Sequence, residues 1–234
     1  MKPGFALSLS FDGICLLQRA AGGWRSVGEV SLEAVDLGAE LAALRDKALA
    51  YGADGLGCKV IVPNEQIRYL GVDTAGAGDV AREALVREAL QGATPYAVDD
   101  LVYDLSLDGG TTYVSAVARE TLVEAEAFAV EHGFNPVSFV AAPGENQFLG
   151  EPFFGPSAHA STLPGAPEIE PDGIAVVVIG PAKPVLKPAP KPAPEPEATP
   201  APEPEAAPAP VETQPPAFGF SSRRRPKQAP EQDA

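Results

Sequence analysis

Hydrophobic and polar residues alternate along the first thirty residues in a pattern that is typical of short β-strands. Residues 5–11 alternate in this way, and Asp12-Gly13 is a strong signal for a two-residue hairpin turn before residues 14–19. A second turn at Gly22-Gly23 leads to residues 24–31, which we expect to form a third strand. The pattern predicts a three-stranded antiparallel meander.

The period of the pattern changes after this meander. Apolar residues recur every three to four positions over residues 35–51 and predict a helix with one apolar face. Residues 57–62, with the sequence GCKVIV, form a short apolar run that is typical of a strand covered on both faces. We expect residues 66–72 to form another strand.

Residues 81–141 read without a break as helix, strand, hairpin, strand, helix and strand. Asp79 is the expected N-cap of the first helix, and Gly92 is well placed just after its end. Helices that alternate with strands in this way indicate an α/β fold. The later predicted elements are strands over residues 101–106 and 111–118, a helix over residues 121–132 and a strand over residues 137–142.

The pattern fades after Pro143. Residues 145–171 are rich in Gly, Pro and Ser without a clear period, and residues 174–179 (IAVVVI) are either one more edge strand or an exposed apolar patch. From Pro181 onward, 16 of the 54 residues are proline, so we expect a disordered, extended tail. We therefore divide the chain into a folded domain (1–155), a connecting segment with a candidate edge strand (156–180) and a tail rich in Pro, Ala and Glu (181–234).

The negative charge is confined to the part that we expect to fold. The chain has a formal net charge of -15, but residues 181–234 hold seven basic and seven acidic side chains. Residues 1–180 therefore hold 10 of the 17 basic and 25 of the 32 acidic side chains. An acidic domain repels phosphate backbones, so we expect no nucleic-acid binding. A basic protein partner is the electrostatic complement.

Cysteine usage and the N-terminus indicate a cytoplasmic protein. Cys15 and Cys58 lie in apolar runs without CxxC spacing, which is typical of unpaired thiols in a reducing compartment. A disulfide between them is the less favoured alternative. The N-terminus lacks the apolar core of a signal peptide, and no window approaches the roughly 20 apolar residues of a membrane span.

Four aspartates, Asp99, Asp100, Asp104 and Asp108, lie close together in the sequence. Their spacing does not match a calcium-binding loop, which needs alternating oxygen ligands and a closing glutamate. We interpret them as a solvated acidic face and as the candidate contact surface for a protein partner. No metal site is predicted.

No catalytic set can be assembled from the sequence. His132 and His159 are the only histidines, and neither belongs to a Ser-His-Asp or Cys-His arrangement. We therefore expect no enzyme activity and no cofactor. Near the C-terminus, Phe218 and Phe220 precede Arg223, Arg224 and Arg225. This aromatic and basic cluster is a candidate contact for a protein or an acidic membrane surface, and a solubilising tail is the alternative.

The order and spacing of residues 59–147 resemble a known family. VIVPNEQIRYL is followed by AREALVREALQGATPYAVDDLVYDLS, a DGG hairpin and TYVSAVARETLVEAEAFAVEHGFNPVSFVAAP. This series resembles the cytoplasmic actin-like (ribonuclease-H-like) domain of the L component of type II secretion systems. It is also similar to the M component of type IV pilus assembly. The resemblance covers about residues 4–147 and implies a mixed sheet with flanking helices.

The resemblance also bears on nucleotide binding. In actin-like folds a hairpin such as Asp12-Gly13 cradles a nucleotide phosphate, so these residues are the weak candidates for cofactor binding. The bare dipeptide is also a common turn, its neighbours lack the small polar residues of such a loop, and no GxxxxGK[ST] motif is present. The fold consists of two related halves with nucleotide between them, and after Ala142 we expect no second half. ATP hydrolysis is therefore not expected.

Three functions follow from these observations. The first is a non-catalytic half-domain that docks a protein partner, in an assembly of the secretion or pilus type, with the proline-rich arm as a tether. A homodimer, and membrane association through another chain, are compatible with it. The second is a nucleotide-binding, ATPase-related protein that uses Asp12-Gly13. The third is a spacer or adaptor that acts through its proline-rich tail.

Overall fold

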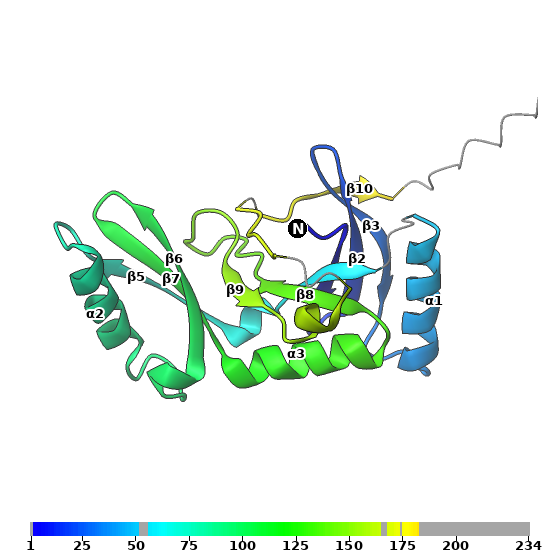
Figure 1. Cartoon of the computed structure of the whole chain (residues 1–234), viewed down its shortest axis with the longest axis horizontal. Helices are drawn as coiled ribbons and strands as arrows, with labels where there is room; N and C mark the ends of the chain where they lie inside the picture. Colours follow the sequence, from blue (N-terminus) through cyan, green and yellow to red (C-terminus); the bar gives the residue numbers. More distant parts are fainter. Residues whose placement is uncertain (1, 52–55, 165–167, 174, 183–234) are drawn as a thin grey trace, which may run out of the picture. The chain divides into compact units, whose positions relative to one another are not determined.

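The computed structural model describes residues 2–51, 56–164, 168–173 and 175–182. These residues form a seven-stranded sheet and a three-stranded sheet with flanking helices (Figure 1). The α-helices are α1 (Leu37–Leu49), α2 (Asp79–Leu90) and α3 (Arg119–Glu131), with 3₁₀ turns at η1 (Asn64–Gln66), η2 (Val98–Asp100) and η3 (His159–Thr162). The strands are β1 (Phe5–Leu9), β2 (Ile14–Ala20), β3 (Gly23–Val30), β4 (Gly57–Ile61), β5 (Ile67–Asp73), β6 (Leu101–Asp108), β7 (Thr111–Ala118), β8 (Asn135–Val140), β9 (Phe153–Pro156) and β10 (Val178–Pro181).

The larger sheet is mixed and has the order β10-β3-β2-β1-β4-β8-β9. β1, β2 and β3 form the predicted antiparallel meander. β4 then pairs parallel to β1, and β8 pairs parallel to β4. The α/β class and the mixed sheet with flanking helices, both expected from the sequence, are confirmed.

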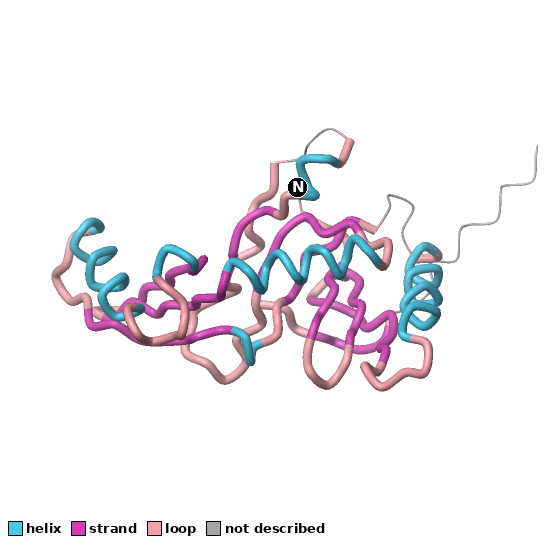
Figure 2. Tube along the Cα trace, turned by 90° about the horizontal axis from the view of Figure 1, so that it is seen from below, coloured by secondary structure: helices cyan, strands magenta, loops and turns pink. Residues whose placement is uncertain are grey.

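Helices α1 and α3 cover one face of the larger sheet, as two views show (Figures 1 and 2). α1 packs against β2 and β3, and α3 packs against β8. The Asp36 carboxylate caps α1 by accepting a hydrogen bond of 2.9 Å from the Ala39 amide. The side chains that these helices bury are Leu41, Leu44 and Ala48 from α1 and Leu122, Ala125 and Ala129 from α3.

The three-stranded sheet is an insertion between β4 and α3. Its order is β5-β7-β6, and both pairings are antiparallel. α2 covers one of its faces, where Val86 and Leu90 pack against Val114 and Ala116. Because β7 ends at Ala118 and α3 begins at the next residue, this small sheet is directly continuous with the helix that covers the larger one.

Two local predictions need correction. Asp79 is the first residue of α2 instead of its N-cap, which is Gly78, and the Asp79 carboxylate pairs with Arg82 at 2.7 Å. Residues 145–171 contain a strand, β9, and a 3₁₀ turn, η3, although their sequence shows no period. Both elements are only four residues long, and a periodic pattern needs a longer window to emerge.

The apolar run at residues 174–179 contributes in part to an edge strand. β10 lies parallel to β3, and Trp24 donates its backbone N–H to the Val177 carbonyl at 2.8 Å. Ala182 extends the contact by donating to the Ser26 carbonyl at 2.7 Å. The expected disordered tail lies, after Ala182, outside the described residues and stays a prediction.

The face of the larger sheet that carries no helix contains a buried lysine. Lys59 lies on β4, an interior strand between β1 and β8, and its side chain is 1% exposed. The sequence predicted that this strand is covered on both faces, and its burial confirms this. The cover on the second face consists of the chain that follows β8, which contributes Ala142, Phe153 and Val176 to a small apolar cluster.

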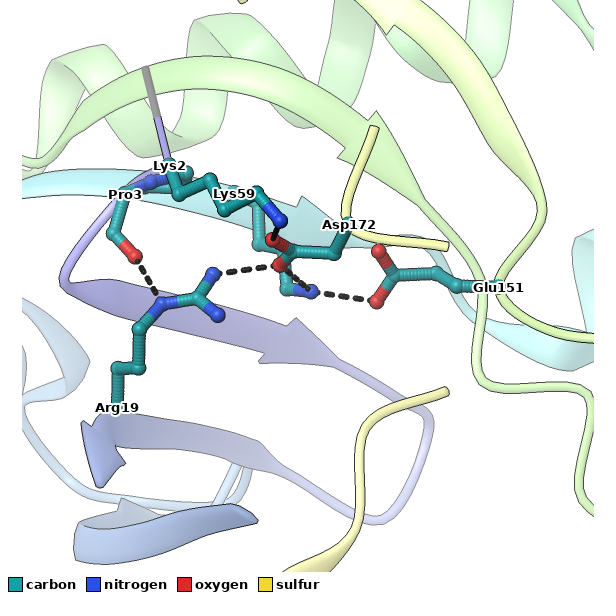
Figure 3. Close-up of polar contacts among 6 residues, drawn as sticks. All are labelled: Lys2, Pro3, Arg19, Lys59, Glu151 and Asp172. Carbon is teal, nitrogen blue, oxygen red and sulfur yellow. Dashed lines mark hydrogen bonds and ion pairs between the residues drawn. The ribbon is translucent and has the colours of Figure 1, made fainter. Parts of the chain in front are cut away.

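Two acidic residues of that covering chain neutralise the lysine (Figure 3). The Lys59 ammonium donates to Glu151 Oε1 at 2.5 Å and to Asp172 Oδ2 at 2.8 Å. Arg19 on β2 also donates to Asp172 Oδ2, at 2.5 Å. The Arg19 guanidinium and the Lys59 ammonium lie 4.4 and 4.7 Å from the centroid of the Trp24 ring. We call these five residues the Lys59 cluster.

The two carboxylates of the Lys59 cluster respond differently to their surroundings. Burial raises the pKa of Glu151, although Lys59 acts in the opposite direction. Burial also acts to raise the pKa of Asp172, but the hydrogen bonds from Arg19 and Lys59 outweigh it and lower that pKa. A buried charge that loses its partner is costly, so each member of the cluster depends on the others.

Replacing Lys59 with methionine should destabilise the fold. The Lys59→Met variant leaves the Glu151 carboxylate buried without its cation, and we expect the free energy of unfolding to fall by about 3–5 kcal/mol. Adding Glu151→Leu should recover part of this loss, because the uncompensated charge is then gone. Urea denaturation followed by circular dichroism measures both effects.

A matched substitution controls for the loss of a lysine. Lys47 is exposed on α1, so Lys47→Met should change stability by no more than about 0.5 kcal/mol. If Lys59→Met were as stable as Lys47→Met, the Lys59 cluster would not hold the covering chain.

Candidate docking surface

The Asp12-Gly13 turn is closed by its own neighbours. Ser10 Oγ donates to the Gly13 carbonyl at 2.8 Å and accepts from the Gly13 amide at 3.2 Å. A Cβ on Gly13 would lie 2.8 Å from the Val30 carbonyl oxygen, so close packing against β3 accounts for the glycine. Asp12 is exposed at the tip of the turn. The structure thus gives a local reason for this motif, and its binding of nucleotide stays an untested alternative.

The four predicted acidic residues do not form one cluster. Asp99 and Asp100 lie in η2 before β6, Asp104 lies within β6, and Asp108 is its last residue. A strand rises about 3.4 Å per residue, so Asp100 and Asp108 lie roughly 27 Å apart. Asp99 is exposed and pairs with Arg87 at 2.5 Å. Proximity in the sequence was misleading here because the segment is extended.

Asp104 has a structural role instead of a place on an open surface. Its carboxylate accepts hydrogen bonds from the Leu105 amide at 2.9 Å and from the Phe153 amide at 2.8 Å. Nearby, Ser106 Oγ accepts a hydrogen bond of 2.9 Å from the Leu149 amide. Asp104 therefore attaches the chain that enters β9 to β6, which joins the two sheets.

Asp100 contributes to a different surface, on the outer side of α3. Val123, Ala127 and Val130 are exposed there, with Val123 at 63% and Val130 at 41%. They follow the spacing i, i+4, i+7, so they form one stripe along the helix, opposite the buried set. Charged side chains flank this apolar stripe, among them Glu120, Glu124 and Glu131.

A hollow of about 580 Å³ opens at the N-terminal end of this stripe. Tyr96, from the loop after α2, and Val123 supply its apolar wall, and Tyr96 is 40% exposed. Three carboxylates and one guanidinium line the hollow. Within the described ranges, none of these carboxylates makes a hydrogen bond or ion pair. The charged lining residues are Asp100, Glu120, Glu124 and Arg119. We call the hollow and the stripe together the α3 surface.

The sequence contains a signal for this surface that single motifs do not show. By their spacing alone, Glu120, Glu124 and Glu126 are typical of surface charges on a helix. Glu126 instead accepts hydrogen bonds from the backbone of Ala158 and His159, at 3.2 and 2.6 Å, and holds η3 against α3. The feature that indicates this surface is the apolar stripe on the outer side of α3. It is a second stripe, because the same helix already buries a separate set of apolar residues in the core.

Other candidate chemistry from the sequence finds local structural roles. The His132 ring packs against Phe128 at 4.6 Å, and His159 Nε2 lies 3.3 Å from Asn135 Oδ1. Among the described residues, no three His, Cys, Asp or Glu side chains are grouped as a metal site would require. In the same part of the chain, no helix has the length and hydrophobicity needed to cross a membrane. The cluster at Arg223, Arg224 and Arg225 lies outside the described residues.

Comparison with solved structures finds similar chains in two assemblies. One is the cytoplasmic domain of EpsL, an inner-membrane component of the type II secretion system of Vibrio cholerae. Its TM-score is 0.45 at 17% identity, and the match covers 59% of this chain and 56% of that chain. Another is the PilM-PilN type IV pilus biogenesis complex, with a TM-score of 0.43, 17% identity, and coverage of 61% and 48%.

These structures come from the two protein classes that the sequence resembles. The chain spans about half the length of the solved chains it matches. At these TM-scores and this identity, the likeness concerns the arrangement of elements and carries no argument about function. No protein-family model matches the chain, and no curated protein does.

Removing the Asp104 carboxylate should loosen the chain that enters β9. In Asp104→Ala the Phe153 amide loses its acceptor, and a lost hydrogen bond to a charged group costs about 1.5–3 kcal/mol. We expect faster hydrogen exchange at residues 149–156 and lower stability, measured by exchange mass spectrometry and urea denaturation. Asp108→Ala, at an exposed end of the same strand, should change neither. Unchanged exchange at Phe153 in Asp104→Ala would contradict the assignment.

Proposed function

We propose that this chain is a non-catalytic docking module that binds a protein partner through the α3 surface. The observation that carries the proposal is the exposed stripe of Val123, Ala127 and Val130 beside a hollow with three carboxylates that have no partner among the described residues. An apolar stripe on a helix is normally buried, and a surface that leaves one exposed next to charges has the composition of a binding site.

The chemistry of the surface defines the partner. Carboxylates at Asp100, Glu120 and Glu124 outnumber the single guanidinium of Arg119, so the partner segment should carry Lys or Arg. Val123 and Tyr96 provide apolar area that the stem of a long basic side chain, or a neighbouring aliphatic residue, can cover. A basic segment with interspersed apolar residues fits both features.

The setting of this interaction also belongs to the proposal. The sequence resemblance favours an assembly of the secretion or pilus type, in which a domain without a catalytic set acts as a scaffold. Residues 181–234 would tether the module, because their composition favours an extended chain. Membrane association through another chain of such an assembly would be compatible with this role.

Reversing two charges on the α3 surface should abolish partner binding. We expect Glu120→Lys with Glu124→Lys to reduce capture of the partner by the tagged chain at least about tenfold, equal to 1.4 kcal/mol or more. Quantitative affinity purification with mass spectrometry compares the two baits. Glu33→Lys with Glu88→Lys makes the same charge change at exposed positions outside this surface and should leave capture unchanged.

A second pair of variants tests the apolar stripe separately. Val123→Ser removes the apolar contact without adding charge and should weaken capture of the same partner. Val80 on α2 is 87% exposed, so Val80→Ser is the matched control and should have no effect. Equal capture by the charge-reversed bait and the unmodified bait would exclude the α3 surface as the docking site.

A further inference from the structure

Both edges of the larger sheet are protected against pairing with another strand. β10 is four residues long, ends in Pro181 and has a register shift where it pairs with β3. β9 is equally short, ends in Pro156 and also shows a register shift in its pairing. Short strands, prolines and irregular pairing are the means by which natural sheets prevent further strand addition.

One edge of the smaller sheet is covered, and the other is open. Residues 149–153 lie along β6, with amide hydrogen bonds to Ser106 and Asp104. β5, at the opposite edge, pairs with β7 over seven residues without a register shift, from Ile67 to Asp73. It contains no proline, and within the described part of the chain its backbone bonds only to β7, apart from the Ile67 amide, which donates to the Asn64 carbonyl at the start of the strand. β5 is therefore the unprotected edge of the described sheets.

We propose that β5 pairs antiparallel with β5 of a second copy of this chain. The order β5-β7-β6 in each copy would then give a continuous six-stranded sheet across a two-fold axis. Main-chain hydrogen bonds between the two edges supply the association, as in other strand-addition interfaces. This interface uses backbone groups of β5 and does not depend on partner binding at the α3 surface, although Tyr96 of that surface and Arg68 of β5 line a common hollow.

Symmetry determines the register of the pairing. A two-fold axis perpendicular to the joined sheet leaves the same face of each copy on the same side. Residues that lie opposite each other across the new pairing must therefore carry their side chains on the same face. Full overlap of a seven-residue strand then centres on Leu70, which lies opposite Leu70 of the second copy. In this register Tyr69 of each copy lies opposite Gly71 of the other copy, so this pair occurs twice. Gly71 has no side chain to clash with Tyr69, whose hydroxyl donates to Asn64 Oδ1 of its own chain at 2.8 Å.

The charges of β5 favour a second copy as the occupant. Arg68 and Asp73 make the strand neutral, although the whole chain carries a net charge of -15. In the symmetric register Arg68 lies opposite Val72, and Asp73 lies opposite Ile67, so no like charges meet. The edge is thus the part of an acidic domain at which two copies can approach without local repulsion.

A lysine at the centre of the edge should prevent the pairing. We expect the unmodified full-length chain to show a mass of about twice 24.2 kDa by analytical ultracentrifugation, more strongly as NaCl screens the net charge. Gly71→Lys should be monomeric. A Cβ at Gly71 would contact Thr111 and Tyr113 at an ordinary 3.5 Å, so the monomer should accept the substitution. Val80→Lys, with the same added charge on α2, should remain dimeric.

Hydrogen exchange of the unmodified chain provides a measurement that needs no variant. Amides of β5 that point away from β7 should become protected as the protein concentration rises, while those of β10 should not change. A monomer at every concentration and salt level, or a dimer that survives Gly71→Lys, would overturn the proposal. Since partner capture at the α3 surface is a separate readout, the failure of one proposal is distinguishable from the failure of the other.

Discussion

The buried Lys59 ammonium is the constraint on which the rest of the structure depends. The interior strand β4 is covered on both faces, but helices cover only one of them. On the other face a lysine replaces an apolar residue, and a charge in that position needs a partner. Glu151 and Asp172, which follow β8 along the chain, supply it, and so the segment that carries them becomes part of the fold.

This arrangement decides which surfaces remain for binding. The covering chain occupies the helix-free face of the larger sheet. The two edges of this sheet are protected against pairing by prolines and by the short length of the edge strands. Asp104 attaches the same chain to the smaller sheet. Among the described residues, the outer side of α3 and the edge of β5 are two features that remain open. The first presents side chains, and the second presents backbone groups, so they are suited to different partners.

The sequence predicted those parts of the fold that depend on local periodicity. The meander, the helices with their buried faces and the doubly covered strand all follow from spacing over seven or more residues, or from a continuous apolar run. Lys59 could not be interpreted in the same way, because one charge within GCKVIV does not identify its distant partners. β9 is too short to show a period. The four aspartates do not lie together because an extended strand separates residues that a helix would bring together, and their part in partner binding stays a prediction.

Charge explains why the two open surfaces should select different partners. At the α3 surface the unpaired carboxylates add to the net negative charge of the domain, so a second copy would be repelled there and a basic segment attracted. Along β5 the two charges cancel, and the repulsion between two acidic domains acts only from a distance and is screened by salt. The same excess of acidic residues therefore directs a foreign partner to the helix and leaves the neutral edge for self-association.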